Sequence, residues 1–262
     1  MPVTWMDGTS LSFNTMLLLE QVQLSWLPGS VPEQDLALAL RANPVIEWYL
    51  RHKCPEISSW LDKILNNVDE NTLKDATSVR QAEISVMKAI NDWLVYGIDP
   101  AVYDSQPFLG WDSSELLNLV DFGGKTVIDV GSGTGRLALA VAPLARVVFA
   151  VEPIANLRLY LRQKAHRQDL KNVYCIDGLI TSLPFPADFA DVTMGGHVFG
   201  EYLEEETREL LRVTHPGGMV ILCPGNNDCD NETHRFLVEH GFACSRFEEP
   251  QDGWKRKYWK QK

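Results

Sequence analysis

Apolar residues recur three and four positions apart through much of the first hundred residues. The spacing is clearest from Val79 to Tyr96 and ends at Gly97, as expected for one long helix. Further periodic stretches open at Pro32, Pro44 and Pro55, where proline suits the first helical turn. Four tryptophans on the apolar helical faces are expected in the core: Trp26, Trp48, Trp60 and Trp93. The pattern predicts a helical segment over residues 1–110.

The pattern changes after Trp111, where short apolar runs rich in valine and isoleucine alternate with helical stretches. The predicted strands are residues 125–130, 145–151, 172–177, 189–195 and 219–224. Helices are predicted at residues 136–144, 154–168 and 232–241, and two short strand-like runs follow at 243–249 and 254–260. Strands alternating with helices imply a parallel sheet with right-handed crossovers. Residues 111–262 are therefore expected to form an α/β domain.

The last of these runs, WKRKYWK, mixes aromatic and basic residues. Proteins that bind single-stranded nucleic acid use such mixtures. We interpret the run instead as a final edge strand, whose lysines discourage pairing between sheet edges.

A glycine-rich turn, VIDVGSGTGR, joins the first predicted strand to a helix. A Walker loop requires Gly-Lys-Ser/Thr after the turn, and Gly135-Arg136-Leu137 does not match it. A dinucleotide fingerprint requires a small residue where Arg136 stands. The remaining pattern is D-x-G-x-G-x-G from Asp129 to Gly135. It carries no basic phosphate clamp, which suits a cofactor without phosphates.

Several motifs in order make residues 111–247 similar to the class I S-adenosylmethionine-dependent methyltransferases, especially the small-molecule group called type 11. Besides the glycine turn they are VFAVEP, CIDGLITSLPF, FADVTMGGHVFGEYL and LLRVTHPGGMVIL. The resemblance implies a seven-stranded, mostly parallel, doubly wound sheet of strand order 3-2-1-4-5-7-6, with the seventh strand antiparallel. It also implies a helical segment, residues 1–110, on the substrate side of the methyltransferase domain, residues 111–262.

The resemblance assigns roles to residues at the ends of the strands. Glu152 would bind the two ribose hydroxyls, because two carboxylate oxygens suit two O–H donors. Asp177 would accept from the adenine amino group, and Leu179 would pack near the adenine. The full set expected at S-adenosylmethionine is Asp129, Gly131, Ser132, Gly133, Glu152, Pro153, Asp177, Gly178, Leu179 and Gly195.

Each assignment has a simpler structural alternative. The three glycines of the turn could serve only a tight connection from strand to helix. Asp129 could orient the amides of the turn rather than touch the ligand. Glu152 could cap a helix beside Pro153, and Asp177 could be a turn residue.

His197 is the candidate catalytic base. It follows the fourth predicted strand, ligands of open α/β sheets bind outside the carboxyl ends of the strands, and histidine titrates near neutrality. A base is needed only if the acceptor is protonated when it binds. The alternative is that His197 only shapes its loop. Tyr96, Tyr103 and Trp111, in an aromatic stretch before the sheet, either fold over the site or pack the two parts together.

Charge and cysteine content narrow the function. The chain has 24 basic and 35 acidic residues, a formal net charge of −11, which disfavours nucleic acids and anionic membranes as partners. Five cysteines without a C-x-x-C motif indicate reduced thiols and a cytoplasmic protein. The first ten residues do not resemble a secretory signal, no apolar run is long enough to span a membrane, and no metal-ligand cluster is apparent.

The sequence thus predicts methyl transfer from S-adenosylmethionine to a small-molecule acceptor, producing S-adenosylhomocysteine. The alternative is a non-catalytic S-adenosylmethionine-binding protein that regulates or scaffolds a partner. A nicotinamide oxidoreductase is disfavoured by Arg136 in the dinucleotide frame.

Overall fold

The computed structural model describes residues 9–66, 68 and 73–262. Residues 1–8, which bear on the question of a secretory signal, lie outside this part. The chain divides into two compact units, Met1–Tyr103 and Asp104–Lys262. The division falls before the predicted boundary at residue 110, because Asp104 is bound by Lys164 and Tyr160 of the second unit.

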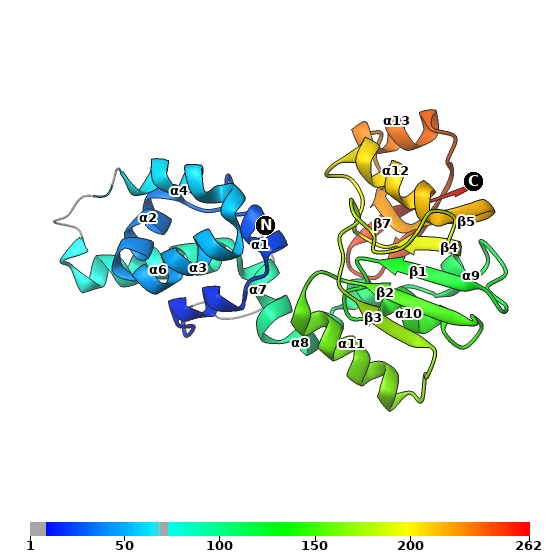
Figure 1. The fold of residues 1–262 in the computed structure, drawn as a ribbon, viewed down its shortest axis with the longest axis horizontal. Coiled ribbons are helices and arrows are strands. Elements are labelled where there is room, and N and C mark those ends of the chain that lie inside the picture. Colours follow the sequence, from blue (N-terminus) through cyan, green and yellow to red (C-terminus); the bar gives the residue numbers. More distant parts are fainter. Residues whose placement is uncertain (1–8, 67, 69–72) are drawn as a thin grey trace. The chain divides into compact units, whose positions relative to one another are not determined.

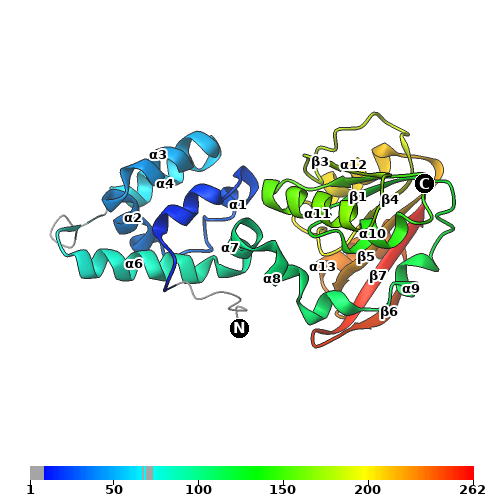
Figure 2. The ribbon, with the colours of Figure 1, turned by 90° about the horizontal axis from the view of Figure 1, so that it is seen from below.

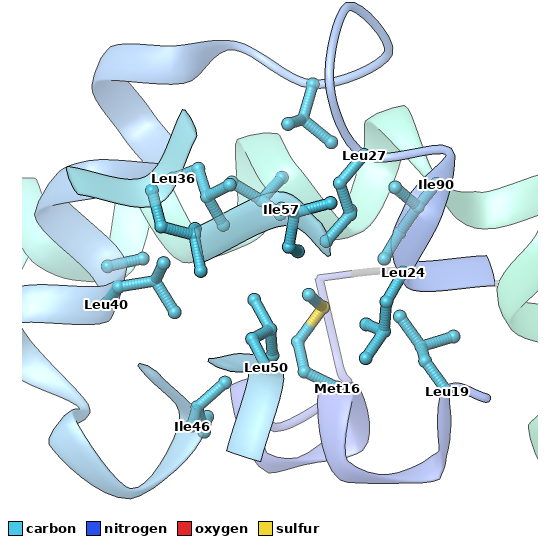
Figure 3. Close-up of a cluster of buried hydrophobic side chains, with 14 of the residues drawn as sticks. Met16, Leu19, Leu24, Leu27, Leu36, Leu40, Ile46, Leu50, Ile57 and Ile90 are labelled. Atoms are coloured by element: carbon cyan, nitrogen blue, oxygen red, sulfur yellow. The ribbon is translucent and has the colours of Figure 1, made fainter. Parts of the chain in front are cut away.

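The first unit is helical, with one apolar core. Its elements are η1 (Phe13–Leu18), α1 (Gln21–Ser25), α2 (Glu33–Ala42), α3 (Pro44–Lys53), η2 (Pro55–Ile57), α4 (Ser58–Leu65), α6 (Ala76–Ala89), α7 (Asn91–Ile98) and, reaching the boundary, α8 (Pro100–Asp104). Figure 3 shows the core, where leucines and isoleucines from the helices surround Met16. The side chains labelled there are buried, and burying apolar surface is the main stabilising contribution to such a unit.

Two details of this unit differ from the prediction. The expected helix over residues 79–96 is interrupted at Ile90, whose backbone leaves the helical region with φ −107° and ψ 16°. The apolar spacing does not reveal the break, since Val86, Ile90 and Leu94 on both sides of it face the same core. Trp48 is 59% exposed rather than in the core, and its ring stacks on His52.

The second unit is an α/β domain built on a seven-stranded sheet of order β3-β2-β1-β4-β5-β7-β6 (Figure 1). The strands are β1 (Thr126–Val130), β2 (Val147–Val151), β3 (Val173–Ile176), β4 (Ala190–Gly195), β5 (Thr214–Asn227), β6 (Ala243–Glu249) and β7 (Gly253–Gln261). Neighbouring strands pair in parallel except for β7, which is antiparallel to β5 and β6. The predicted fold class is confirmed.

Helices cover both faces of this sheet because its central strands are apolar on both sides. The helical elements are η3 (Pro107–Gly110), α9 (Ser114–Leu117), α10 (Arg136–Val141), α11 (Ala155–Arg167), α12 (Leu203–Val213) and α13 (Glu232–Glu239). Val127 packs toward α10 and α11, whereas Ile128 packs toward α12 and α13. Figures 1 and 2 show these two helical layers with the sheet between them. This alternation is the period of two expected of a strand.

The prediction that residues 254–260 form an edge strand is wrong. They lie in β7, which is hydrogen-bonded to β5 on one side and to β6 on the other, so β6 is the edge. Two of the lysines are buried and paired rather than exposed: Lys257 binds Glu115, and Lys255 binds Asn227 and Asp252.

The parallel strands share one direction, so their carboxyl ends lie at one edge of the sheet, here called the carboxyl edge. It carries the ends of β1 to β5, and also the end of β6, because β6 runs parallel to β5 across the antiparallel β7. Within the described residues, no helix has the length and apolar character to cross a membrane.

Candidate functional site

The glycine-rich turn leaves β1 at the carboxyl edge. Gly131, Gly133 and Gly135 have φ values of +64°, +52° and +90°, a region that residues with a side chain rarely adopt. Ser132 between them is buried, and its N–H donates to the carbonyl oxygen of Val151 at the end of β2 over 3.0 Å. Its hydroxyl lies 2.8 Å from the carbonyl oxygen of Asp129 and 3.2 Å from that of Val151. The hydrogen bond from Ser132 therefore holds the turn against β2, and the positive φ values on either side of Ser132 favour glycine.

Asp129 lies beneath the turn, not on its surface. Its side chain is buried in β1, and Oδ2 accepts from the backbone N–H of Ala138 in α10 over 2.9 Å. Burial, with the nearby charge of Glu152 as a smaller cause, raises the pKa of Asp129 to about 8. In this structure Asp129 orients the turn and the helix after it.

Glu152 ends β2 and connects the second strand to the turn. Its Oε2 accepts from the N–H of Gly133 and its Oε1 from the N–H of Ile154, each over 2.9 Å. Burial raises the pKa of this carboxyl to about 7, although the two amide hydrogen bonds favour the charged form. Each oxygen keeps acceptor capacity, since a carboxylate oxygen can accept two hydrogen bonds.

Arg158 of α11 joins the ends of β2 and β3. Its Nη1 donates to the backbone oxygen of Glu152 over 2.6 Å and to Oδ1 of Asp177 over 2.9 Å. Asp177 is 73% exposed, so its other oxygen is open to a partner. Leu179, two residues further along the chain, is 41% exposed.

Gly178 and Pro153 are placed differently. A methyl group on Gly178 would lie 2.8 Å from Cγ1 of Val151 and 2.9 Å from Cδ of Pro184, so glycine is needed there for packing. Pro153 is half-buried between β2 and α11. The structure brings Glu152, Asp177 and the turn to one part of the carboxyl edge, with these two residues supporting the chain around them.

Val198 covers the glycine faces at the ends of β1 and β4. A methyl group on Gly131 would lie 2.4 Å from its Cγ2, and one on Gly195 would lie 2.7 Å from its Cγ1. Gly195 pairs with Val130 in the sheet, so the two glycines are neighbours across the strands. The absence of side chains at both positions makes room for Val198 in this structure.

His197 stands beside Val198 at the carboxyl edge. Its ring nitrogen Nε2 lies 2.9 Å from Oε1 of Glu249, the last residue of β6. Its backbone has φ +56°, and its N–H donates to the carbonyl oxygen of Pro224 over 2.9 Å. The ring of Phe108 in η3 meets it edge to face at 6.0 Å. Backbone strain of this kind recurs at functional sites.

The aromatic stretch before the sheet is divided between the units. Tyr96 and Tyr103 stack edge to face at 4.9 Å within the first unit. Trp111 is buried in the core of the second unit, against Phe247. Arg136 lies 4.4 Å above the Trp111 ring and donates to the backbone oxygens of Leu109 and Trp111. Arg136, which does not fit the dinucleotide-binding pattern, thus holds the backbone of the segment that leads into the domain.

Among the described residues, no three histidine, cysteine or acidic side chains gather where they could hold a metal ion.

Comparison with known proteins bears on this geometry. Residues 128–222 match the family described as "Methyltransferase domain". An uncharacterized methyltransferase of Geobacillus kaustophilus is 27% identical over 164 residues, which are 60% of this chain and 73% of the relative. One of Mycobacteroides abscessus is 34% identical over 105 residues, 38% of this chain and 39% of the relative. The matched part of the chain is thus similar to type 11 methyltransferase domains.

Solved structures of methyltransferases resemble the chain in part. A SAM-dependent methyltransferase of Aquifex aeolicus has 18% sequence identity and a TM-score of 0.49, covering 62% of this chain and 97% of that one. The region that matches the family, residues 128–222, begins within β1, includes β2 to β4 and the proposed cofactor residues, and ends before Glu249.

Four residues of the carboxyl edge were not identified from the sequence: Arg158, Val198, Glu249 and Lys255. Arg158 lies one turn into the helix after β2, a place from which a side chain can reach back to the strand ends. The position of Glu249 could have been predicted from the sequence, because it is the last residue of a predicted strand. In the strand order of the family, that strand runs parallel to the fifth, so its end lies at the carboxyl edge. Val198 and Lys255 carry no signal in the sequence.

Proposed function

We propose that this methyltransferase transfers a methyl group from S-adenosylmethionine to a small-molecule acceptor and releases S-adenosylhomocysteine. The observation that carries the proposal is Glu152, an acidic side chain at the end of β2 that is bonded to Gly133 of the glycine turn. The sulfonium of the cofactor supplies an activated methyl group, so the protein has to align the acceptor and exclude water.

The residues present fit this cofactor chemically. The Glu152 carboxylate has acceptor capacity for two ribose hydroxyls, and the exposed oxygen of Asp177 suits the adenine amino group. Exposed Leu179 offers an apolar contact for the adenine ring. In this proposal Gly131, Ser132, Gly133 and Gly195 border the cofactor, while Asp129, Pro153 and Gly178 support the chain behind it.

Binding by calorimetry tests the cofactor assignment. We expect wild-type protein to bind S-adenosylmethionine and S-adenosylhomocysteine at micromolar concentration, and not NADH. Glu152→Ala removes the acceptor of two hydroxyl donors and is expected to weaken binding by about 1–3 kcal/mol. The control is Asp169→Ala, whose side chain is 86% exposed on the loop before β3. Equal affinity of Glu152→Ala and wild type would disprove the ribose assignment.

One observation favours the alternative of a non-catalytic regulatory or scaffold protein. Val198 occupies the space over Gly131 and Gly195, which the enzyme proposal gives to the methionine part of the cofactor. If Val198 must move for the ligand, Val198→Ala binds S-adenosylhomocysteine more tightly than wild type. Failure of wild type and Val198→Ala alike to bind either sulfur ligand would favour a scaffold whose cofactor site no longer binds.

We propose further that the end of the segment 1–110, residues 104–110 of the second unit, contributes to the acceptor side of the site. Support comes from the end of this segment, where Phe108 contacts His197 and Asp104 is bound by Lys164. Slower amide hydrogen exchange in η3 on addition of cofactor product and acceptor would support this role, whereas unchanged exchange would oppose it. The five cysteines are all free thiols, which supports a cytoplasmic setting, and the acidic net charge supports a small molecule over a nucleic acid.

A further inference from the structure

Glu249 is a fully buried carboxylate at the carboxyl edge of the sheet, with 0% of its side chain exposed. Its Oε1 lies 2.9 Å from Nε2 of His197, while Oε2 has no hydrogen-bond partner. Burying a carboxylate with an unsatisfied oxygen is unfavourable, so this arrangement is not explained by stability.

Lys255 supplies positive charge on the far side of this carboxylate, without a hydrogen bond. Its Nζ is 3.8 Å from Oε2 of Glu249. The ammonium is instead bonded to Oδ1 of Asn227 over 2.6 Å and to Oδ2 of Asp252 over 2.8 Å. His197 is therefore the group in the described structure that gives Glu249 a side-chain hydrogen bond.

The pair determines which ring nitrogen of His197 is available. A carboxylate has no proton to donate, so the hydrogen-bond network assigns the hydrogen to Nε2 and the lone pair to Nδ1. Nδ1 has no hydrogen-bond partner among the described residues, and 37% of the side chain is exposed. The hydrogen bond from the His197 N–H to Pro224 and the edge-to-face contact with the Phe108 ring position the rest of the residue.

We propose that Glu249 is a positioning residue that holds His197 with Nδ1 as the proton-accepting atom of the reaction. The proposal rests on the proposed function and adds a substrate class: an acceptor that carries a proton on the reacting oxygen or nitrogen. The acceptor lone pair forms the new bond to the methyl carbon, the carbon–sulfur bond breaks with its electron pair on sulfur, and the acceptor proton moves to Nδ1. Glu249 then stabilises the imidazolium, because its negative charge lies against Nε2–H.

The tautomer of His197 is the direct test. Nitrogen NMR of the full chain with isotope-labelled histidine distinguishes a ring protonated at Nε2 from one protonated at Nδ1, with His197→Asn to assign the signal. We expect Nε2–H in wild type and in Glu249→Gln, whose amide oxygen still accepts. In Glu249→Leu we expect a mixture of tautomers. Nδ1–H in wild type, or an unchanged signal in Glu249→Leu, would overturn the proposal.

A second measurement needs only wild-type protein, so it decides the matter even if Glu249→Leu does not fold. Diethyl pyrocarbonate reacts with a ring nitrogen that has a free lone pair, and peptide mapping gives the rate for each histidine. The control is His215, which is also 37% exposed but has an acceptor at each ring nitrogen. We expect His197 to react at least about tenfold faster than His215 at neutral pH. Equal rates would overturn the proposal.

Calorimetry with S-adenosylhomocysteine separates this proposal from the proposed function. If Glu249 acts only through His197, both Glu249 variants bind the product with wild-type affinity. Absence of binding in wild type would refute the proposed function, while the tautomer and reagent results would still report on Glu249. A loss of binding confined to the Glu249 variants would show that Glu249 shapes the cofactor site and would overturn the positioning role.

Discussion

Two histidine–carboxylate pairs lie at opposite edges of the same sheet. His197 and Glu249 are at the carboxyl edge, 2.9 Å apart, whereas His215 and Asp191 are at the amino ends of β5 and β4, 3.0 Å apart. Both histidine side chains are 37% exposed. The pairs are nearly equal in distance and exposure, so these two quantities do not distinguish a functional pair from a structural one.

The difference lies in the second ring nitrogen and in the carboxylate. Nδ1 of His215 donates to the carbonyl oxygen of Pro216 over 2.6 Å, and Nε2 faces Asp191. The hydrogen bond to Pro216, followed by that to Asp191, raises the pKa of His215. His215 is therefore favoured as a cation without a lone pair, while His197 keeps Nδ1 open. Glu249 is fully buried, whereas Asp191 is 30% exposed.

The largest expected effect is at the carboxyl-edge histidine. His197→Asn removes the proposed base and is expected to lower the rate of methyl transfer by about 10²–10⁴-fold for an acceptor that wild type methylates. Single-turnover measurements with saturating cofactor give this rate without the contribution of binding. His215→Asn is the matched control and should keep the wild-type rate. A His197→Asn protein with full activity would remove the distinction between the two pairs.

Alanine substitutions at two glycines compare how strongly the carboxyl edge and the amino edge of the sheet affect the free energy of unfolding. Gly131 has φ +64° and Gly217, near the amino end of β5, has φ +84°. Both substitutions introduce backbone strain of about 1 kcal/mol. Gly131→Ala also places a methyl group 2.4 Å from Val198, while nothing lies within 4 Å of that position at Gly217. We expect an additional loss of about 1–3 kcal/mol for Gly131→Ala by urea unfolding. Equal losses would mean that Val198 moves away freely.

Glu152 links stability of the carboxyl edge to pH. Burial raises its pKa to about 7 in the folded protein, above its value in the unfolded chain. The folded state then binds more protons between about pH 4.5 and 7, so wild-type stability falls as pH rises through that window. Glu152→Gln lacks this titration, and its stability relative to wild type should rise from pH 5 to pH 8 by about 1–3 kcal/mol.

Glu209→Gln is the control for that titration, because the hydrogen bond from Arg212 lowers the pKa of Glu209. Wild-type Glu209 stabilises the fold above its unfolded pKa, and the stabilisation is lost as pH falls. The relative stability of Glu209→Gln should therefore rise on acidification, the opposite direction. Urea unfolding at several pH values measures both. A constant difference between wild type and Glu152→Gln would contradict the raised pKa.

The smallest effect is expected at the amino edge. Burial raises the pKa of Asp191, but the amide of Thr126 and His215 together lower it. The charged pair stabilises the fold above the unfolded pKa of Asp191 and below that of His215, and loses this effect as pH rises through the folded pKa of His215. Asp191→Asn should cost about 0.2–1 kcal/mol near pH 5–6, and less at pH 9, in thermal unfolding. Cofactor affinity should stay unchanged. A larger effect at pH 9 would contradict this account.

Local sequence signals identify most of the framework of the site. The runs of valine and isoleucine in β1 and β2, and the glycines between β1 and α10, are enough to place Glu152 and His197 at the ends of strands. Such signals are local, because the period of a strand and the turn preference of glycine depend on residues a few positions apart. These signals do not predict the break at Ile90, because the spacing of apolar residues indicates which face of a helix is buried, not whether the backbone stays helical.

The sequence by itself determined that residues 111–262 fold as a doubly wound α/β domain with an acid after β2, and that a histidine follows β4. Only the tertiary structure decided that His197 meets Glu249, 52 residues away, that Val198 covers Gly131, and that the lysines of β7 lie inside the sheet. The physical reason is that these contacts depend on the order and register of strands that are distant in the chain. A pattern of apolar and polar residues specifies which face of a strand is buried, but not which side chain stands opposite.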